Sequence, residues 1–414
     1  MGRPGLSVER LNGGLGRRQA TNDMITAVVM NAIAGADMVL GEIYTFISIE
    51  EAEAIGITAE YDQTNSVLVW HRLNRLFKRN PSITIYFMPV AQTVTLTQMA
   101  DKDNNYLAKI LRDKKDAVLA MIALNPDEDY EPTIVTGLDE DSVNAMYKLQ
   151  ELYGFEASRL RYPDFFLEGR SFSGTAAAVL NLRELENQCP DVSMVIMADN
   201  DVSVSNALFS KYAAVEDFVG MISKAAVSQN AGEITPIFNL TDKNEGFFQN
   251  AGLSSGTHIN SFSEAALDVL NDKGYIFSTF DAEAEVPGYY IVDTHTCSKS
   301  DSDYAFVENN RTIKKAIRLA RKKLAPRVKA RLYVDETTGQ LRPEIVKDLE
   351  VLGREALRPM LADGDISGGI DSYVDPAQNL LATSEFDYIL TFIPVAIGRR
   401  INLKIGFKNP LKSN

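Results

Sequence analysis

The feature that most constrains this chain is a change of hydrophobic period within its last hundred residues, Val307 to Asn409. At its start, apolar residues recur at i, i+3, i+4, i+7 and i+11, which predicts a helix from about 309 to 324. The apolar stripe consists of Ile313, Ala316, Ile317, Ala320 and Leu324. Thr312 and the two asparagines before it are cap candidates, and Pro326 marks the stop.

A second helix is predicted over 343–361, because proline suits a first helical turn and Pro343 stands there. Its predicted core face consists of Ile345, Leu349, Leu352 and Ala356. Pro359 should kink this helix or end it near Arg358.

Beyond Asp365 the apolar period becomes 2, which is typical of strands. In residues 386–393, apolar side chains occupy odd as well as even positions, and only Asp387 and Thr391 are polar. We therefore expect a strand that is buried on both sides. Residues 401–408 have one apolar face, formed by Ile401, Leu403, Ile405 and Phe407. Such a terminal strand either pairs within its own chain or joins the sheet edge of a neighbouring chain. The pattern alone favours pairing within the chain.

Positive charge is concentrated in one segment of an acidic protein. The net charge is −14, yet residues 309–331 carry ten Lys or Arg and no Asp or Glu, which leaves −24 (32 − 56) for the remainder. The cations of the predicted helix include Arg311, Lys314, Lys315, Arg318, Arg321 and Lys322. This asymmetry predicts one basic face on an acidic body, and it argues against direct binding of nucleic acid. The basic face is either solvated or covered by an acidic partner.

In order and spacing, these segments resemble the C-terminal domain of contractile tail sheath proteins. The matching residues are Asn310-Arg311-Thr312, Asp335 to Gly339, Ile366-Ser367-Gly368, Val374-Asp375-Pro376 with Gln378-Asn379, Ile393-Pro394-Val395 and Ile401 to Phe407. Upstream, Gly288 to Thr296 matches a strand that ends in an Arg-Thr pair in the family, but His295 stands in the place of the arginine. The resemblance covers about residues 270–409.

The resemblance implies a structural subunit, without cofactor or enzymatic activity, that polymerises as a helical sleeve around an inner tail tube. Such sleeves start at a baseplate, end at a tail terminator and contract to drive the tube through a cell envelope. The particle would be a phage tail or injection device assembled in the bacterial cytoplasm. The basic helix would face the tube, and strand 401–407 would be donated to a neighbouring subunit. An N-terminal arm, with Leu6, Val8 and Leu11, would reach another subunit.

The first part of the chain predicts an α/β unit with partly parallel strands. We expect strands at 43–47, 83–90 and 192–197, helices at 49–55, 67–77, 143–153, 175–186 and 217–228, and either element at 117–124. The predicted class is therefore α/β plus α+β in a multidomain chain of 414 residues. Its predicted parts are an N-terminal arm (1–20), an outer α/β domain (21–255), an α+β assembly domain (256–398) and a C-terminal arm (399–414).

Residues that could do chemistry are few. The three histidines, His71, His258 and His295, form no recognisable metal site or catalytic triad. Acidic runs at 127–131 and 139–141 are interpreted as solvated loops, and 199–201 as a turn. Two cysteines far apart in sequence leave a disulfide open but favour folding in a reducing cytosol. We expect no signal peptide and no membrane span. A non-contractile tube or terminator protein and a divergent enzyme remain alternatives.

Overall fold

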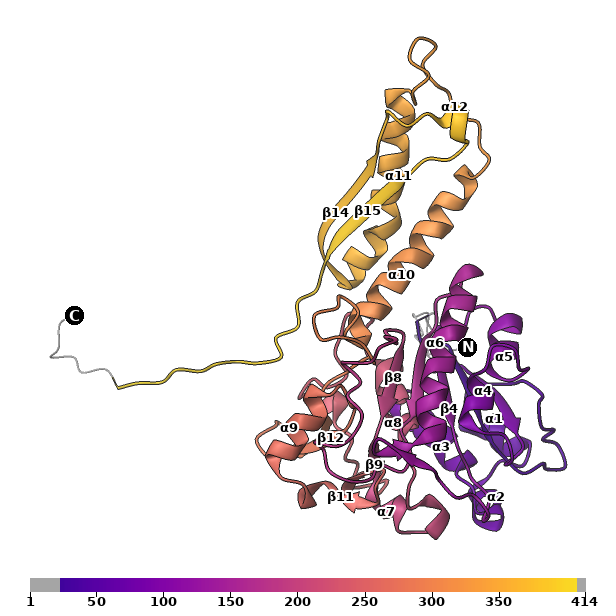
Figure 1. Cartoon of the computed structure of the whole chain (residues 1–414), viewed down its shortest axis with the longest axis vertical. Coiled ribbons are helices and arrows are strands. Elements are labelled where there is room, and N and C mark those ends of the chain that lie inside the picture. The colour runs from indigo at the N-terminus through magenta and orange to yellow at the C-terminus, as the bar shows by residue number, and fades with distance from the viewer. Residues whose placement is uncertain (1–22, 408–414) are drawn as a thin grey trace, which may run out of the picture. The chain divides into compact units, whose positions relative to one another are not determined.

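The computed structural model describes residues 23–407 and divides into two compact units, unit 1 (Met1–Ala325) and unit 2 (Pro326–Asn414) (Figure 1). One continuous hydrophobic core in unit 1 includes Leu253, Ile259, Leu270 and Ile291. The boundary predicted at 255/256 falls inside this core, because the strands and helix on either side of it pack together. The division into compact units therefore comes later in the chain than predicted.

Unit 1 is built on a six-stranded sheet in the order β2-β3-β1-β4-β7-β8. Its strands are β1 (Thr26–Asn31), β2 (Tyr44–Phe46), β3 (Ile85–Val90), β4 (Leu119–Ala123), β7 (Asp164–Glu168) and β8 (Val192–Val195). All neighbouring strands pair in parallel except β2 and β3. The parallel strands are buried along their whole length, which explains their unbroken apolar sequence. The predicted α/β unit with parallel strands is confirmed, and 117–124 contains a strand.

Helices cover both faces of this sheet (Figure 1). On one face, α3 (Val69–Arg79) packs against α8 (Val215–Lys224), and Phe218 of α8 meets Phe166 of β7 edge to face at 5.6 Å between ring centroids. The other face carries α4 (Leu96–Ala100), α5 (Leu107–Asp113) and α6 (Glu140–Ser158).

Smaller elements complete unit 1. The helices are α1 (Ile49–Ala54), α2 (Ala59–Asn65), α7 (Asn200–Ser203), α9 (Glu264–Asp272) and α10 (Val307–Leu324), and short 3₁₀ helices span Ala207–Phe209, Pro236–Phe238 and Ile259–Ser261. The strands are β5 (Ile134–Val135), β6 (Leu138–Asp139), β9 (Met197–Asp199), β10 (Ala251–Leu253), β11 (Thr257–His258), β12 (Ser278–Asp281) and β13 (Gly288–Ile291). A further 3₁₀ turn spans Ala325–Arg327.

The helix predicted at 175–186 is wrong, because this segment is a series of turns. Its buried residues Ala176, Val179, Leu182 and Leu185 recur every three positions, which imitates a helical stripe. Two backbone N–H groups instead bond to distant segments, from Leu180 to the carbonyl of Thr136 and from Leu182 to that of Lys273, while those of Val179 and Glu184 make local turns. Turn bonds and long-range partners together therefore replace a continuous intrahelical ladder.

Unit 2 is an antiparallel pair of strands with a helix on one face. It contains α11 (Pro343–Asp363), β14 (Ile366–Val374), α12 (Leu380–Thr383) and β15 (Tyr388–Pro394). The helix α11 continues through Pro359 and ends at Gly364, whose φ is +77°, so the end predicted near Arg358 is wrong. Of its predicted core face, Leu349 and Ala356 are buried, but Ile345 and Leu352 are only half-buried. The buried apolar positions and glycine are Val346, Leu349, Gly353, Ala356, Leu357 and Met360.

The turn predicted at Asp335–Gly339 is confirmed. The carboxylate of Asp335 accepts hydrogen bonds from the backbone N–H groups of Thr337 and Thr338, and Gly339 has a φ of +71°. The prediction that 386–393 is buried on both sides is wrong, because Ile389 and Ile393 are 54% and 58% exposed. The opposite face of β15 is half-buried, because α11 covers that side of the sheet and no described element of unit 2 covers the other.

Candidate assembly surface

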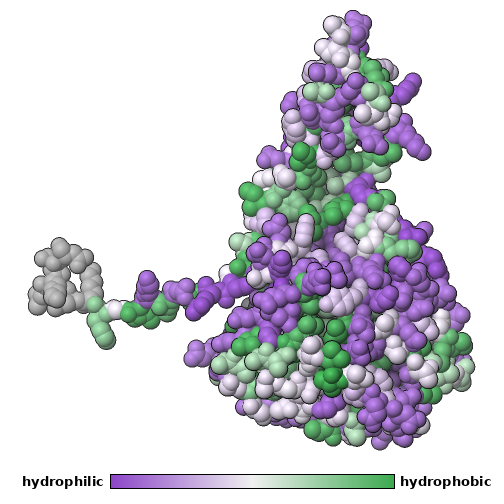
Figure 2. Space-filling model, in the orientation of Figure 1, coloured by the Kyte–Doolittle hydropathy of each residue, from purple (hydrophilic) through white to green (hydrophobic). Residues whose placement is uncertain are grey.

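The C-terminal strand predicted at 401–408 has no partner strand in the described part of the subunit. Its apolar residues Ile401, Leu403, Ile405 and Phe407 are 88%, 76%, 87% and 110% exposed. Figure 2 shows hydrophobic residues along this extended segment with no other part of the chain packed on them. Pairing within the chain, which the pattern alone favours, is therefore wrong for the subunit by itself.

The β14–β15 pair offers a matching incomplete sheet. Among the described residues each of these strands pairs only with the other, so each leaves a free backbone edge. The uncovered face carries Tyr373 and Ile389, which are opposite each other in the register and are 51% and 54% exposed. A two-stranded sheet of this kind is marginal alone and gains stability from further strands.

The predicted basic helix exists as α10, but it begins at Val307, so its cap candidates lie inside the helix. Its apolar stripe is mostly half-buried, and the buried side of its first turns is polar. Arg311 is 3% exposed and donates to the backbone carbonyls of Ala225 and Ala226 at the end of α8. A role facing a partner is therefore wrong for Arg311 in this fold.

Lys314 is likewise a core residue, at 1% side-chain exposure. Its ammonium lies 2.7 Å from a carboxylate oxygen of Asp164 and 2.7 Å from one of Asp191, and 4.6 Å from the centre of the Tyr153 ring. Burial lowers the pKa of Lys314, but the two carboxylates outweigh it and the pKa is raised. Because it is the shared ion-pair partner of two buried carboxylates, Lys314 cannot face a partner either.

The remaining predicted cations differ in their surroundings. Lys315 and Arg318 reach the carboxylate of Asp23, at 3.0 and 2.6 Å, and so hold the first described residue against α10. Arg321 and Lys322 are exposed, and Arg321 donates to the carbonyl of Leu160. Of the predicted partner-facing cations, Arg321 and Lys322 at the C-terminal end of α10 are thus the remaining candidates.

The predicted N-terminal contact residues Leu6, Val8 and Leu11 lie outside the described residues, as does the rest of the arm (1–20).

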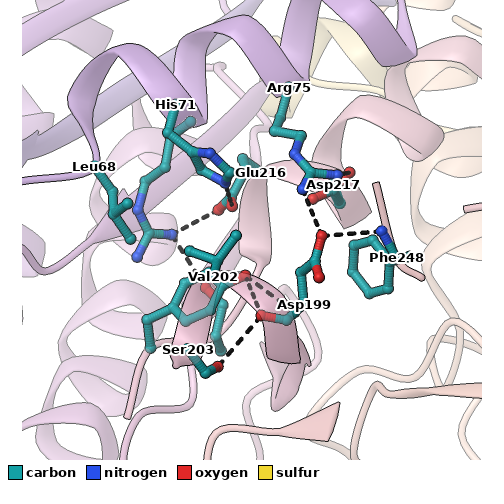
Figure 3. Close-up of polar contacts among 12 residues, drawn as sticks. Leu68, His71, Arg75, Asp199, Val202, Ser203, Glu216, Asp217 and Phe248 are labelled. Carbon is teal, nitrogen blue, oxygen red and sulfur yellow. Dashed lines mark hydrogen bonds and ion pairs between the residues drawn. The ribbon is translucent and has the colours of Figure 1, made fainter. Parts of the chain in front are cut away.

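The sequence analysis missed a buried charge network that joins α3 to α8 and two strands (Figure 3). Arg72, Arg75 and Arg79 lie at i, i+3 and i+7, one face of α3. Arg72 bonds Glu168 of β7 at 2.9 Å and Glu216 of α8 at 2.6 Å. The other pairs are Arg75 with Asp199 at 2.5 Å, Arg79 with Asp217 at 2.6 Å, and Arg170 with Glu168 at 3.3 Å.

Four arginines and four carboxylates therefore balance inside unit 1, all at most 7% exposed. Removing one member of a buried pair leaves an uncompensated charge, which typically costs ~3–5 kcal/mol. The network fixes the relative position of α3, α8 and the sheet. The only sequence signal for this network is that Arg72, Arg75 and Arg79 share one face of a helix. The same spacing is expected of a solvated helix face, so the sequence does not distinguish the two.

The crevice where doubly wound folds commonly bind ligands is filled. The parallel strands follow the order β3-β1-β4-β7-β8, so the topological switch point lies between the carboxyl ends of β1 and β4. There the side chains of Asn31 and Asn125, 0% and 2% exposed, bond to each other's backbone at 3.0 and 2.8 Å. The Asn31 amide also donates to the carbonyls of Ala91 and Val94.

The acidic runs serve local structure. Asp139 is buried and caps α6, and Asp141 accepts from the backbone N–H groups of Leu96 and Thr97 at the start of α4, so the solvated loop predicted at 139–141 is wrong. No group of three or more His, Cys, Asp or Glu within the described residues could hold a metal ion. No helix in residues 23–407 is long and apolar enough to cross a membrane.

Comparison with known proteins extends this description. The sequence matches the family DUF2586 over most of its length, with its N-terminal domain over residues 3–295 and its C-terminal domain over residues 303–412. No functionally curated protein matches the sequence.

Solved structures share the fold from end to end. A chain of the anti-feeding prophage baseplate has a TM-score of 0.60 at 14% identity, covering 99% of both chains. A chain of the contracted anti-feeding prophage helical sheath has the same score and identity, covering 98% of this chain and 99% of that one. A chain of the contracted PVC sheath complex, from an extracellular contractile injection system, has a TM-score of 0.58 at 10% identity, covering 98% of each. The chain therefore belongs to the DUF2586 family, and it has the fold of a chain found in contractile injection systems.

Proposed function

We propose that this protein is the sheath subunit of a contractile tail or injection apparatus. The observation that carries the proposal is the exposed apolar segment 401–407, which belongs to the same chain as an incomplete two-stranded sheet. The fold shared over nearly the whole length with chains of contracted sheath assemblies supports it. In this proposal unit 1 supplies the outer α/β body, and unit 2 with the two chain ends supplies the assembly part.

Strand 401–407 of one subunit would add to the β14–β15 sheet of a neighbour. Backbone hydrogen bonds to the free sheet edge would supply affinity, and alternate side chains would supply specificity. Each of Ile401, Leu403, Ile405 and Phe407 would contribute on the order of 1.5–3 kcal/mol if fully buried. The N-terminal arm, through Leu6, Val8 and Leu11, would make a second link to another copy.

Contraction would then need no nucleotide or cofactor. The subunits would assemble in an extended, metastable arrangement and move to a better-packed one, while the donated strands keep neighbours attached. The proposed partners are other copies of the chain, an inner tube, a baseplate and a terminator. Assembly would occur in the cytoplasm of a bacterial host, and the protein would act as part of the particle.

The test compares two double variants of the terminal strand. Leu403→Ser with Ile405→Ser removes apolar side chains, and Asn402→Ser with Lys404→Ser changes the polar positions between them. We expect the first to remain a folded monomer and the second to polymerise like the wild type. Electron microscopy and sedimentation report polymer, and circular dichroism reports folding.

If the apolar variant forms normal sleeves, strand donation is disproved. Rigid tubes that never shorten would instead favour a non-contractile tail component. The filled switch point at Asn31 and Asn125 speaks against the remaining alternative, an enzyme of the doubly wound type.

A further inference from the structure

The two cysteines of the chain, 108 positions apart in sequence (297 − 189), lie directly opposite each other in space. They form an isolated antiparallel β-bridge in which the Cys189 N–H donates to the Cys297 carbonyl at 2.8 Å. The Cys297 N–H donates to the carbonyl of Val192 at 2.8 Å. Opposed residues in an antiparallel pair have Cα atoms about 4.5–5.5 Å apart, and their side chains point to the same side. Disulfides require about 4.4–6.8 Å between Cα atoms, so the backbone already meets that requirement.

Both thiols are free, and they differ in access. Cys297 is 0% exposed. Cys189 is 1% exposed but borders a surface hollow of about 290 Å³, lined also by Tyr147, Gln150, Glu151, Asn187 and Gln188. A reagent in this hollow therefore meets Cys189, whereas Cys297 is fully buried and does not line the hollow.

We propose that Cys189 and Cys297 are a redox modification site, which a small-molecule disulfide such as oxidised glutathione converts into an intramolecular disulfide. The Cys189 thiolate attacks one sulfur of the reagent, whose S–S bond breaks and releases one thiolate. The Cys297 thiolate then attacks Cys189 in the mixed disulfide and releases the second thiolate. Two electrons pass from the protein sulfurs to the reagent, and the two protons lost by the protein thiols go to the released thiolates.

The reaction is slow at neutral pH and faster in alkali. Burial, followed by the nearby Asp191, raises the pKa of Cys189 to about 12, and burial raises the pKa of Cys297 well above its ordinary value. Only the thiolate attacks, so the rate should rise about tenfold per pH unit between pH 7 and 9.

The disulfide would tie two segments that backbone hydrogen bonds already join. Cys189 precedes β8, and Cys297 lies in the segment between β13 and α10. The closed loop of 108 residues (297 − 189) would constrain the unfolded chain, with an upward shift of the melting temperature on the order of 5 °C. Thiols stay reduced in a cytosol and oxidise outside it. A particle of the proposed function would therefore assemble with the pair open and act with it closed, although the chemistry itself does not rest on that function.

The experiment incubates the full chain with oxidised glutathione at pH 8.5 and follows intact mass and free thiols. We expect both thiols to disappear, the mass to fall by that of two hydrogens, the melting temperature to rise, and dithiothreitol to reverse all three changes. The matched variants separate the steps. Cys297→Ser should stop at a glutathione adduct on Cys189, and Cys189→Ser should stay unmodified because Cys297 is inaccessible.

Two results would overturn the proposal. One is persistence of both thiols in the wild type under these conditions, and the other is stable glutathione adducts without ring closure. Serine is close to cysteine in size, and circular dichroism of both variants shows whether they are folded. None of these measurements depends on assembly, so a negative result for the disulfide is distinct from a failure of the proposed function.

Discussion

At the scale of single residues, Glu216 shows how the buried network responds to protons. Its carboxylate faces Arg72 at 2.6 Å, His71 at 3.9 Å and its neighbours Asp217 and Glu168. Burial raises the pKa of Glu216 from 4.5 to about 7, although Arg72 opposes the shift. The folded protein therefore binds this proton more tightly than the unfolded chain does.

The sign of the pH effect follows from linkage. A carboxyl with a raised folded pKa stabilises the fold fully below its unfolded pKa of 4.5, and this contribution is lost as the pH rises through about 7. Relative to Glu216→Gln, the free energy of unfolding of the wild type should fall as the pH rises from 5 to 8. Urea titrations of unit 1 across this range measure it. Glu283→Gln, at an exposed site, should keep the wild-type pH dependence. Equal slopes for wild type and Glu216→Gln would show that the carboxyl does not titrate in this range.

At the scale of elements, one glycine sets how closely α11 approaches the β14–β15 pair. The Tyr388 hydroxyl donates to the Leu349 carbonyl at 2.9 Å and bonds the Ser372 hydroxyl at 2.6 Å. A Cβ at Gly353 would lie 1.8 Å from the Tyr388 hydroxyl oxygen, which no real contact allows. The absence of a side chain at this helical position lets the strand pair bond to the helix backbone.

Gly353→Ala should therefore destabilise unit 2 by ~1–3 kcal/mol through overpacking. Removing the clash partner with Tyr388→Phe should reduce that cost, and the two substitutions should couple in a double-mutant cycle. Hydrogen exchange of the β14–β15 amides measures the stability of unit 2 in each single variant and in the double variant. The matched control is Gly154→Ala in α6, where the added Cβ meets nothing within 4 Å and helix propensity predicts a gain of ~0.5–1 kcal/mol. A destabilising effect of Gly353→Ala that Tyr388→Phe leaves unchanged would contradict this account.

At the scale of the whole molecule, the basic segment serves two purposes. Its first half is part of the core of unit 1, and the exposed cations begin at Arg321. We infer that any contact of α10 with an acidic tube uses Arg321 and Lys322. Exposed charge pairs are individually worth ~0.2–1 kcal/mol and weaken with salt, which suits a sleeve that must release the tube.

Charge reversal separates the two purposes. Arg321→Glu with Lys322→Glu should leave the subunit folded but reduce assembly around the tube, most strongly at low salt. Lys314→Glu should prevent folding, because it adds a third buried carboxylate beside Asp164 and Asp191. Co-sedimentation with tube and circular dichroism give the two readouts. If the Arg321→Glu, Lys322→Glu variant binds the tube as the wild type does, with the same salt dependence, the C-terminal end of α10 is simply solvated and contacts no tube.

The sequence by itself determined the elements whose signal is local. The apolar run of β3 marks a buried strand, the helical spacing around α3 and α6 marks helices, and the turn at Asp335 follows from its own side chain. The run at 117–124 suits a strand or a helix equally, and only the sheet made it β4. The order of motifs near the C-terminus also predicted the fold that the chain shares with chains of contractile injection systems.

Only the tertiary structure decided which polar groups are buried and which strands find partners. Lys314 is separated by 150 residues from Asp164 and Arg72 by 144 from Glu216. The turns at 175–186 bond to Thr136 and Lys273, 44 (180 − 136) and 91 (273 − 182) residues away. A local pattern records that a face is apolar or charged, but not what lies opposite it. For the same reason an alternating strand at 401–407 reads alike whether its partner belongs to its own chain or to another.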